Sequence, residues 1–290
     1  MHGMRVGYAC VNTQLPSAAR TTRLANATSE RLSELTGENL LALEAILRWN
    51  AEHGIRVFRI TSNLVPFASH PVHGGAWWDE FADRFAAIGG LMESEGMRLS
   101  THPGQYTVVG SIREHVVQAA VAELEYHARL LAAFGLDAGH KIVVHLTGDA
   151  DRFPTGFQRL SDGVRSRLVL ENDERRSLAE VLQVAESLQI PAVFDVFHHE
   201  LNPSLEGLGT RELVERAAET WGPEDGRPEV HFSTQEAGKR PGAHAESLED
   251  EAFAAFAEEV ADLPIDCILE VKDKERSALR ALEILAAVRA

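Results

Sequence analysis

Apolar residues follow two alternating patterns along the chain. Short runs rich in β-branched and aliphatic residues predict eight strands, at Met4–Cys10, Ile55–Ile60, Met97–Thr101, Lys141–Leu146, Arg167–Glu171, Ala192–Val196, Glu229–Phe232 and Ile265–Val271. Between them lie longer segments in which apolar residues recur every three or four positions, as at Leu40, Leu43 and Leu47, which predicts helices with one buried face. Ser177 and Glu180 form a capping-box pattern where another such segment begins.

This alternation predicts the fold class. Strands that alternate with helices indicate βα units around a parallel sheet, and eight units is the number that closes a (β/α)8 TIM barrel. We therefore expect residues 1–290 to form a single α/β domain of this kind. An open, doubly wound sheet is the alternative, but no glycine-rich phosphate turn follows the first predicted strand.

Histidines and carboxylates stand at the ends of most predicted strands. The first-rank candidates are His102, His145, Glu171, His231 and Glu270, and a D-x-x-H spacing adds Asp195 and His198. The active site of a (β/α)8 enzyme forms at these strand ends, and buried carboxylates there need partners because their desolvation is costly. Histidine with carboxylate and no cysteine suits Zn²⁺ or Mn²⁺. The set exceeds the ligands of one ion, so we expect a cluster of two or three ions, an arrangement used for phosphoester hydrolysis.

Several other histidines and the two cysteines are expected to serve the structure rather than the chemistry. We expect structural roles for His53, His73, His115, His127 and His140. Cys10 and Cys267 are expected to be buried, reduced thiols on neighbouring strands, and so few cysteines favour a reducing compartment. No apolar run approaches the roughly 18 residues of a membrane span, and the first residues lack the apolar stretch of a signal peptide. We therefore expect a cytoplasmic protein.

The net charge restricts the possible nucleic-acid functions. The chain has 28 Lys and Arg against 44 Asp and Glu, for a formal charge of −16. This balance argues against a protein that simply coats nucleic acid, since phosphate neutralisation needs basic side chains. It permits a nucleic-acid enzyme whose groove is locally basic or holds divalent cations.

Motifs throughout the chain point to one known family. They are GYACVN (7–12), FASHP (67–71), STHPGQY (100–106), VVHLTG (143–148), LENDER (170–175), FDVFHHELNP (194–203), VHFSTQ (230–235), KRPGAHA (239–245) and LEVKDKE (269–275). In this order they resemble the UV damage endonucleases. The resemblance implies a (β/α)8 barrel related to endonuclease IV that nicks DNA immediately 5′ of a UV photoproduct, either a pyrimidine dimer or a 6-4 product.

The resemblance also implies residue roles. It places metal ligands at His102, His145, Glu171, Asp195, His198, His231, His244 and Glu270, with His70 and Glu229 beside them. It assigns the probing of the distorted duplex to Tyr8, Asn12, Gln105 and Tyr106. The chain departs from the family at position 229, where a lysine is common. A lysine would serve a metal only if carbamylated, whereas Glu229 presents a carboxylate directly or merely orients His231 or His145.

The expected reaction is metal-assisted phosphodiester hydrolysis, with Glu171, Glu270, Glu229 and His231 as its catalytic residues. Two ions bridged by Glu171 and touched by Glu270 would activate water, and a third on His198 and His244 would stabilise the leaving 3′ oxygen. Mn²⁺ is the expected ion, with Zn²⁺, Co²⁺ and Mg²⁺ as alternatives. Loops expected at the same face carry candidate phosphate contacts, namely Lys239, Arg240, Lys272 and Lys274.

The expected partner is double-stranded DNA that contains UV lesions, bound at the nucleoid by a monomer that needs no membrane and no protein partner. Three alternatives stay open. An apurinic endonuclease of the endonuclease IV type would differ in lesion preference. A metal-dependent sugar isomerase or epimerase would also place carboxylates at a barrel mouth, but it would need fewer histidines. A non-catalytic module that binds damaged DNA has no need of the full ligand set.

Overall fold

The computed structural model describes residues 3–290, in which eight parallel strands close into a barrel in sequence order. The strands are β1 (Arg5–Cys10), β2 (Val57–Ile60), β3 (Arg98–Thr101), β4 (Lys141–His145), β5 (Leu168–Glu171), β6 (Ala192–Asp195), β7 (Glu229–Phe232) and β8 (Asp266–Leu269). β1 pairs with both β2 and β8, which closes the sheet. The predicted TIM barrel is confirmed, and each strand lies within or matches its predicted run, while the open-sheet alternative is wrong.

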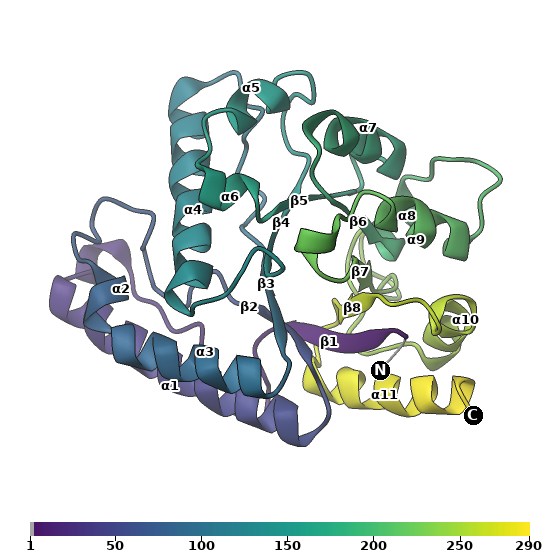
Figure 1. Cartoon of the computed structure of the whole chain (residues 1–290), viewed down its shortest axis with the longest axis horizontal. Helices are drawn as coiled ribbons and strands as arrows, with labels where there is room; N and C mark the ends of the chain where they lie inside the picture. Colours follow the sequence, from purple (N-terminus) through teal and green to yellow (C-terminus); the bar gives the residue numbers. More distant parts are fainter. Residues whose placement is uncertain (1–2) are drawn as a thin grey trace.

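Helices surround the barrel on its outside (Figure 1). They are α1 (Ser29–Glu52), α2 (Trp77–Glu80), α3 (Ala82–Ser94), α4 (Glu114–Ala133), α5 (Phe153–Phe157), α6 (Asp162–Arg165), α7 (Leu178–Leu188), α8 (Val196–Leu201), α9 (Thr210–Ala218), α10 (Asp250–Val260) and α11 (Glu275–Val288), with the 3₁₀ turns η1 (Leu24–Asn26) and η2 (Pro223–Asp225). None of the helices in residues 3–290 has the length and hydrophobicity needed to cross a bilayer.

Local sequence signals explain where the helices begin and which face they bury. The capping box is present at α7, where the Ser177 side chain accepts from the backbone N–H of Glu180 and the Glu180 carboxylate accepts from that of Ser177. Thr28 caps α1, because its side chain accepts a hydrogen bond from the backbone N–H of Arg31. The predicted apolar stripe of α1 is buried against the barrel at Leu40 and Leu43. The strand ends are therefore held in place by a ring of anchored helices.

One buried carboxylate organises the end of the barrel where the strands begin. Asp266 is 0% exposed and lies 2.7 Å from Arg5, 3.0 Å from Arg98 and 3.1 Å from Arg227. Burial would raise the pKa of the Asp266 carboxyl, but the hydrogen bonds from Arg5 and the charges of Arg98 and Arg5 hold it below the usual value. The three arginines link strands β1 and β3 and the turn before β7 to β8, which ties distant parts of the chain together.

Asp266→Asn should lower the free energy of unfolding at pH 7 by about 3–5 kcal/mol, because it leaves the buried Arg98 and the partly buried Arg5 and Arg227 without their counter-charge. The depressed pKa means that this stabilisation is present above about pH 4 and is lost as the pH falls through the native pKa, so wild type and variant should converge in acid. Urea unfolding at several pH values measures this. Asp262→Asn, which alters an exposed pair with Arg211, is the matched control and should change stability little. Equal stability of Asp266→Asn and wild type at pH 7 would contradict the assigned role.

Candidate metal centre

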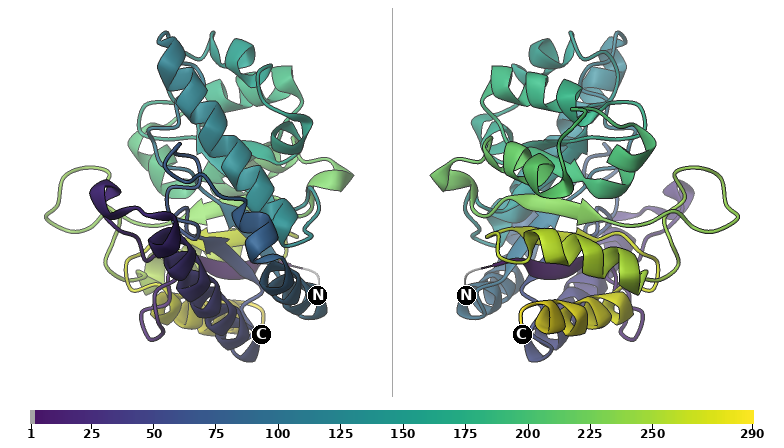
Figure 2. Two further views of the ribbon diagram at one scale, coloured as in Figure 1. Left: turned by 90° about the vertical axis from the view of Figure 1, so that its left-hand side faces the viewer. Right: turned by 90° about the vertical axis from the view of Figure 1, so that its right-hand side faces the viewer.

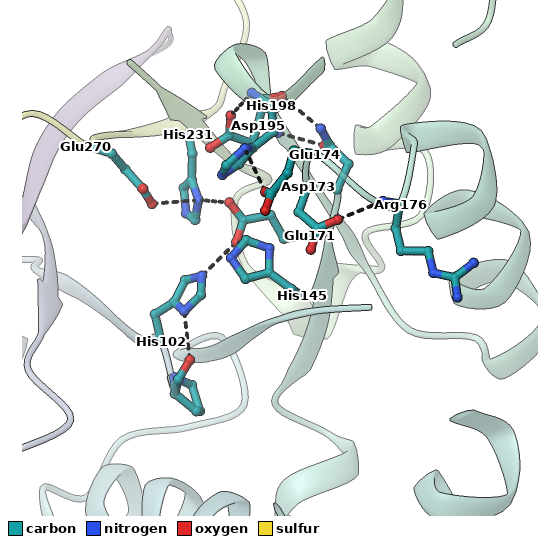
Figure 3. A network of polar contacts seen from close by, with 12 residues as sticks. His102, His145, Glu171, Asp173, Glu174, Arg176, Asp195, His198, His231 and Glu270 are labelled. Carbon is teal, nitrogen blue, oxygen red and sulfur yellow. Dashed lines mark hydrogen bonds and ion pairs between the residues drawn. The ribbon is translucent and has the colours of Figure 1, made fainter. Parts of the chain in front are cut away.

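The predicted site residues converge on Glu171, at the carboxyl end of β5 (Figure 3). One carboxylate oxygen of Glu171 lies 2.7 Å from Nε2 of His102, and the other lies 2.6 Å from Nδ1 of His231. Nδ1 of His145 is 3.7 Å from the first oxygen. Glu171 itself is 0% exposed. Three imidazoles from three other strand ends therefore surround a single buried carboxylate.

Strand register explains this convergence. His145 stands directly opposite Glu171 in the β4–β5 pair, and Asp195 directly opposite His231 in the β6–β7 pair. Side chains at the same level of neighbouring parallel strands share a face, so each of these pairs points to the same side of the sheet. Glu270 directly follows β8 and lies 3.2 Å from His231. The site is thus a consequence of residue type at six successive strand ends.

Two groups of side chains have donor atoms close enough to hold a metal ion. His102, His145 and Glu171 form the first group, and Glu171, Asp195, His231 and Glu270 form the second. Within each group, the ligand atoms lie within 4.8 Å of one another. Glu171 belongs to both groups, so its carboxylate could contribute to each of two cations held there.

His198 and His244 lie next to these groups. The ring centroids of His198 and His244 are 5.6 Å apart, and that of His198 is 5.7 Å from His145. Nε2 of His244 is 3.7 Å from Glu270, and Nδ1 of His198 is 3.7 Å from Glu174. All the ligands expected from the family resemblance therefore lie together, and Glu174 joins them as an acidic neighbour that sequence reasoning missed.

Several buried polar atoms at this site lack a hydrogen-bond partner within residues 3–290. They are Nδ1 of His145, Nδ1 of His198, Nδ1 of His244, Oδ2 of Asp195 and Oε2 of Glu229. An unpaired buried polar atom costs about 1–3 kcal/mol, so native proteins rarely leave several in one place. Unpaired histidine nitrogens and carboxylate oxygens are donor atoms that divalent cations accept, so the residues present suit the expected metal cluster.

The charges at the site also favour cations. Burial, together with the nearby charges of Glu171 and Glu270, raises the pKa of Asp195 to about 8, against the opposing effect of His198. Burial would raise the pKa of Glu171 too, but His231, His145 and His102 hold it well below its usual value. Burial therefore works against the charged form of Asp195, and a bound cation would favour that form.

Glu229 belongs to neither ligand group, but it contacts His231, a member of the second group. One oxygen of Glu229 accepts from Ser100 Oγ at 3.0 Å and lies 3.0 Å from Nε2 of His231. Nδ1 of the same ring faces Glu171 and Glu270. Glu229 therefore stands behind His231, where a carboxylate fixes the tautomer of a metal-binding imidazole.

Arg59 is a site residue that sequence reasoning missed. It lies on β2, is 7% exposed, and its Nη1 is 2.5 Å from Oε1 of Glu270. Burial works against the charged guanidinium, yet Glu270 and Glu171 keep the pKa of Arg59 above its usual value. The signal was an arginine inside the apolar run Ile55–Ile60, but an arginine in a strand can point either to the mouth or outward to the helices.

Three predicted site residues do not reach the cluster. Tyr8 is 0% exposed, and its hydroxyl donates to Asn50 and accepts from Asn12, which is itself only 2% exposed. Both side chains are packed in the interior of this structure, and their expected DNA contact stays a prediction. His70 is exposed and accepts from the backbone N–H of Val72, so it serves its own loop rather than the metal groups.

The other expected DNA-contacting residues surround the mouth. Gln105 and Arg240 line a cavity of about 430 Å³ together with His102, His198 and Glu270. Tyr106 is 69% exposed, and its hydroxyl donates to Glu123 over 3.4 Å. Lys239 is exposed on the loop between β7 and α10.

The remaining expectations near the mouth are met only in part. Lys272 is exposed but pairs with Glu246 at 3.0 Å, and Lys274 is only partly exposed. Both cysteines are unpaired thiols and Cys267 is buried, but Cys10 is only half-buried and lines the cavity at the mouth. The expectation that Cys10 is buried is therefore wrong, since it is the last residue of β1.

Comparison with known proteins agrees with this geometry. The family model for UV-endonuclease UvdE matches residues 4–290. A UV DNA damage endonuclease of Clostridium perfringens is 35% identical over 97% of this chain and 71% of its own length, and the UV-damage endonuclease of Schizosaccharomyces pombe is 34% identical over 94% of this chain and 49% of its own length.

Solved structures give the same result. The crystal structure of SacUVDE superposes with a TM-score of 0.93 and 37% identity, covering 99% of each chain. A D-psicose 3-epimerase of Clostridium cellulolyticum superposes with a TM-score of 0.57 and 13% identity over 85% of this chain and 93% of its own, which shows a shared fold alone. With a family model matched over almost its whole length, this chain belongs to the UV-endonuclease UvdE family, whose members are UV DNA damage endonucleases.

Proposed function

We propose that this protein is a DNA repair endonuclease that hydrolyses the phosphodiester immediately 5′ of pyrimidine dimers and 6-4 products with a cluster of two or three divalent ions. The observation that supports it is the pair of ligand groups that share Glu171 at the barrel mouth. In a chain of this family, such a bridged pair is the arrangement suited to in-line displacement at phosphorus.

The donor set narrows the choice of ion. The two groups together offer imidazoles and carboxylates and no thiolate, which suits Mn²⁺, with Zn²⁺, Co²⁺ and Mg²⁺ as alternatives. When bound there, such ions supply Lewis-acid stabilisation of the charge that develops on the phosphate. His198 and His244, together with their neighbour Glu270, are the candidate ligands of a third ion.

The chain's own residues would position this chemistry. Arg59 holds Glu270 as a carboxylate aimed at the second ligand group. His231 would use Nδ1 toward that group while its Nε2–H donates to Glu229. Glu229 would then set the tautomer of His231, which gives a reason for a carboxylate at position 229.

Lesion recognition would rest on the exposed pair Gln105 and Tyr106. A photodimer stacks poorly and bends easily, so displacing it from the duplex costs less than displacing normal bases. Tyr106 is exposed to solvent, while Gln105 lines the cavity at the mouth together with His102 and Glu270. Together they would fill the gap left in the base stack next to the scissile phosphate.

The deciding experiment is incision of UV-irradiated supercoiled plasmid, compared with unirradiated plasmid and with plasmid that carries abasic sites. We expect preferential nicking of irradiated DNA, loss of nicking with a chelator, and recovery with Mn²⁺. Glu171→Gln should abolish nicking and lower the metal content measured by elemental analysis while circular dichroism stays native, because an amide cannot bridge two cations. Preferential nicking of abasic plasmid would favour the apurinic alternative. Full activity and full metal content in Glu171→Gln would exclude the proposed cluster.

Glu229→Gln should reduce the rate or the metal affinity roughly 10- to 100-fold, since an amide weakens the acceptor behind His231. Activity of wild type should not depend on dissolved bicarbonate, because Glu229 already carries a carboxylate. Glu229→Lys should recover activity only with added bicarbonate, through carbamylation of the new amine. Glu246→Gln, at an exposed acidic residue, is the control. An unchanged rate and metal content in Glu229→Gln would remove Glu229 from the site.

The double variant Gln105→Ala with Tyr106→Ala should bind damaged duplex more weakly, by about 1–3 kcal/mol for each lost stacking contact. Its metal content should match wild type, since neither side chain belongs to a ligand group. Tyr106→Phe keeps the ring and removes only the hydroxyl bonded to Glu123, so it should retain most of the affinity. Equal affinity of the double variant and wild type for damaged duplex would rule out the recognition role.

A further inference from the structure

Basic side chains without a partner are unevenly distributed over the surface. Most exposed arginines form ion pairs, as Arg280 does with Asp250 and Arg48 with Glu44. Within residues 3–290, a small set of exposed basic side chains has no ion pair, no side-chain hydrogen bond and no contact with an aromatic face. These residues are Arg23, Arg113, Lys239, Arg240 and Arg276.

All of these residues lie at the same end of the barrel. Arg23 belongs to the connection between β1 and α1, and Arg113 directly precedes α4 after β3. Lys239 and Arg240 lie between β7 and α10, and Arg276 lies in the first turn of α11 after β8. Connections that follow strands of a (β/α)8 barrel lie at the face that carries the active site. Within residues 3–290, the exposed basic side chains that have none of these contacts therefore lie at the face of the metal centre, in a chain of formal charge −16.

The connection between β1 and α1, residues 11–28, which we call the β1–α1 arm, shows this bias most clearly. The chain has 44 acidic residues in 290, about one in every seven, yet none precedes Glu30. Figure 2 shows the part of the arm that carries η1 projecting on the same side of the barrel as the loop between β7 and α10, while η2 lies on the opposite side. The arm therefore projects beside the mouth and contains no acidic residue.

The arm is held firmly at its base and exposed at its tip. Thr13 donates its backbone N–H to buried Glu275 at 2.8 Å. Buried Asn39 accepts from the N–H of Arg20 and donates to its carbonyl, both at 2.9 Å. None of the residues of η1 is buried. A tip presented on a fixed base loses little conformational entropy when it binds a partner.

Two of these arginines are next in the sequence to exposed aliphatic residues. Leu24 is 51% exposed and follows Arg23, and Ile112 is 76% exposed and precedes Arg113. A guanidinium next to an exposed aliphatic group matches the edge of a duplex, where phosphates alternate with sugars and groove walls. These cations come from four separate connections around the barrel mouth. Such a spread suits a long polyanion rather than a small anion.

We propose that Arg23, Arg113 and Arg276, with Lys239 and Arg240, form a rim that binds the phosphates of undamaged duplex on both sides of the lesion. Arg240 joins this rim to the metal groups, because it lines the same cavity as His244 and Glu270. The acidic remainder of the surface repels DNA, so the rim also orients the duplex toward the mouth. The inference rests on the proposed function and identifies where that substrate is held.

The test measures binding of undamaged duplex between 50 and 200 mM salt for Arg23→Ala, Arg113→Ala, Arg276→Ala and the triple variant. Each lost phosphate contact should reduce the slope of log affinity against log salt by about 0.9. In incision of a lesion duplex, the triple variant should raise KM and leave kcat unchanged, since no metal ligand is altered. Arg48→Ala removes the same charge from α1 at its opposite end and should leave slope and KM unchanged.

An unchanged slope in the triple variant, or a change no larger than that of Arg48→Ala, would overturn the inference. A loss of affinity for single strands with none for duplex would overturn the assignment of duplex as the ligand. If wild type binds duplex with the expected slopes but does not incise irradiated DNA, the proposed function fails while the rim stands.

Discussion

The cost of removing clustered carboxylates from water is the constraint on which the active end of this barrel depends. Glu171, Asp195, Glu229 and Glu270 lie within a few side chains of one another, and Arg59 is the permanently charged cation bonded to one of them. Imidazoles balance part of the negative charge, and burial raises the pKa of Asp195. Clustered carboxylates are costly to bury without positive charge beside them, so a divalent cation bound at this end would relieve part of that cost.

The two ends of the barrel differ in their balance of acidic and basic side chains. At the end where the strands begin, three arginines share the single carboxylate of Asp266 in a closed and satisfied network. At the other end, carboxylates and imidazoles outnumber the cations, and several of their polar atoms lack partners within residues 3–290. The first end stabilises the fold, whereas the second offers donor atoms that could hold ions and is open to solvent through its cavity. This division matches the separation of stability and catalysis between the two faces of (β/α)8 proteins.

Position at a strand end was the most informative sequence feature. The carboxyl end of a strand in a βα unit lies at the mouth whatever the loops do, so polar residues at strand ends, such as His145, Glu171 and Asp195, could be predicted as site residues from the pattern. Residues in loops could not be placed in this way, because loop geometry depends on contacts made after folding. His70 turns back on its own loop, and His244 was expected only from the family resemblance. Arg59 was missed because strand periodicity does not say which alternate residue faces the interior until the register is known.

The distances along the chain between the site residues bear on how the protein folds. His102 and Glu171 are 69 residues apart, and Arg59 and Glu270 are 211 residues apart. No partly folded chain that lacks β8 has both partners of the Arg59–Glu270 pair, and none that lacks β5 has the shared carboxylate. Ions bound to both ligand groups would therefore stabilise the completed barrel more than any chain that lacks β8, and so slow its unfolding more than they assist the early formation of its long-range contacts.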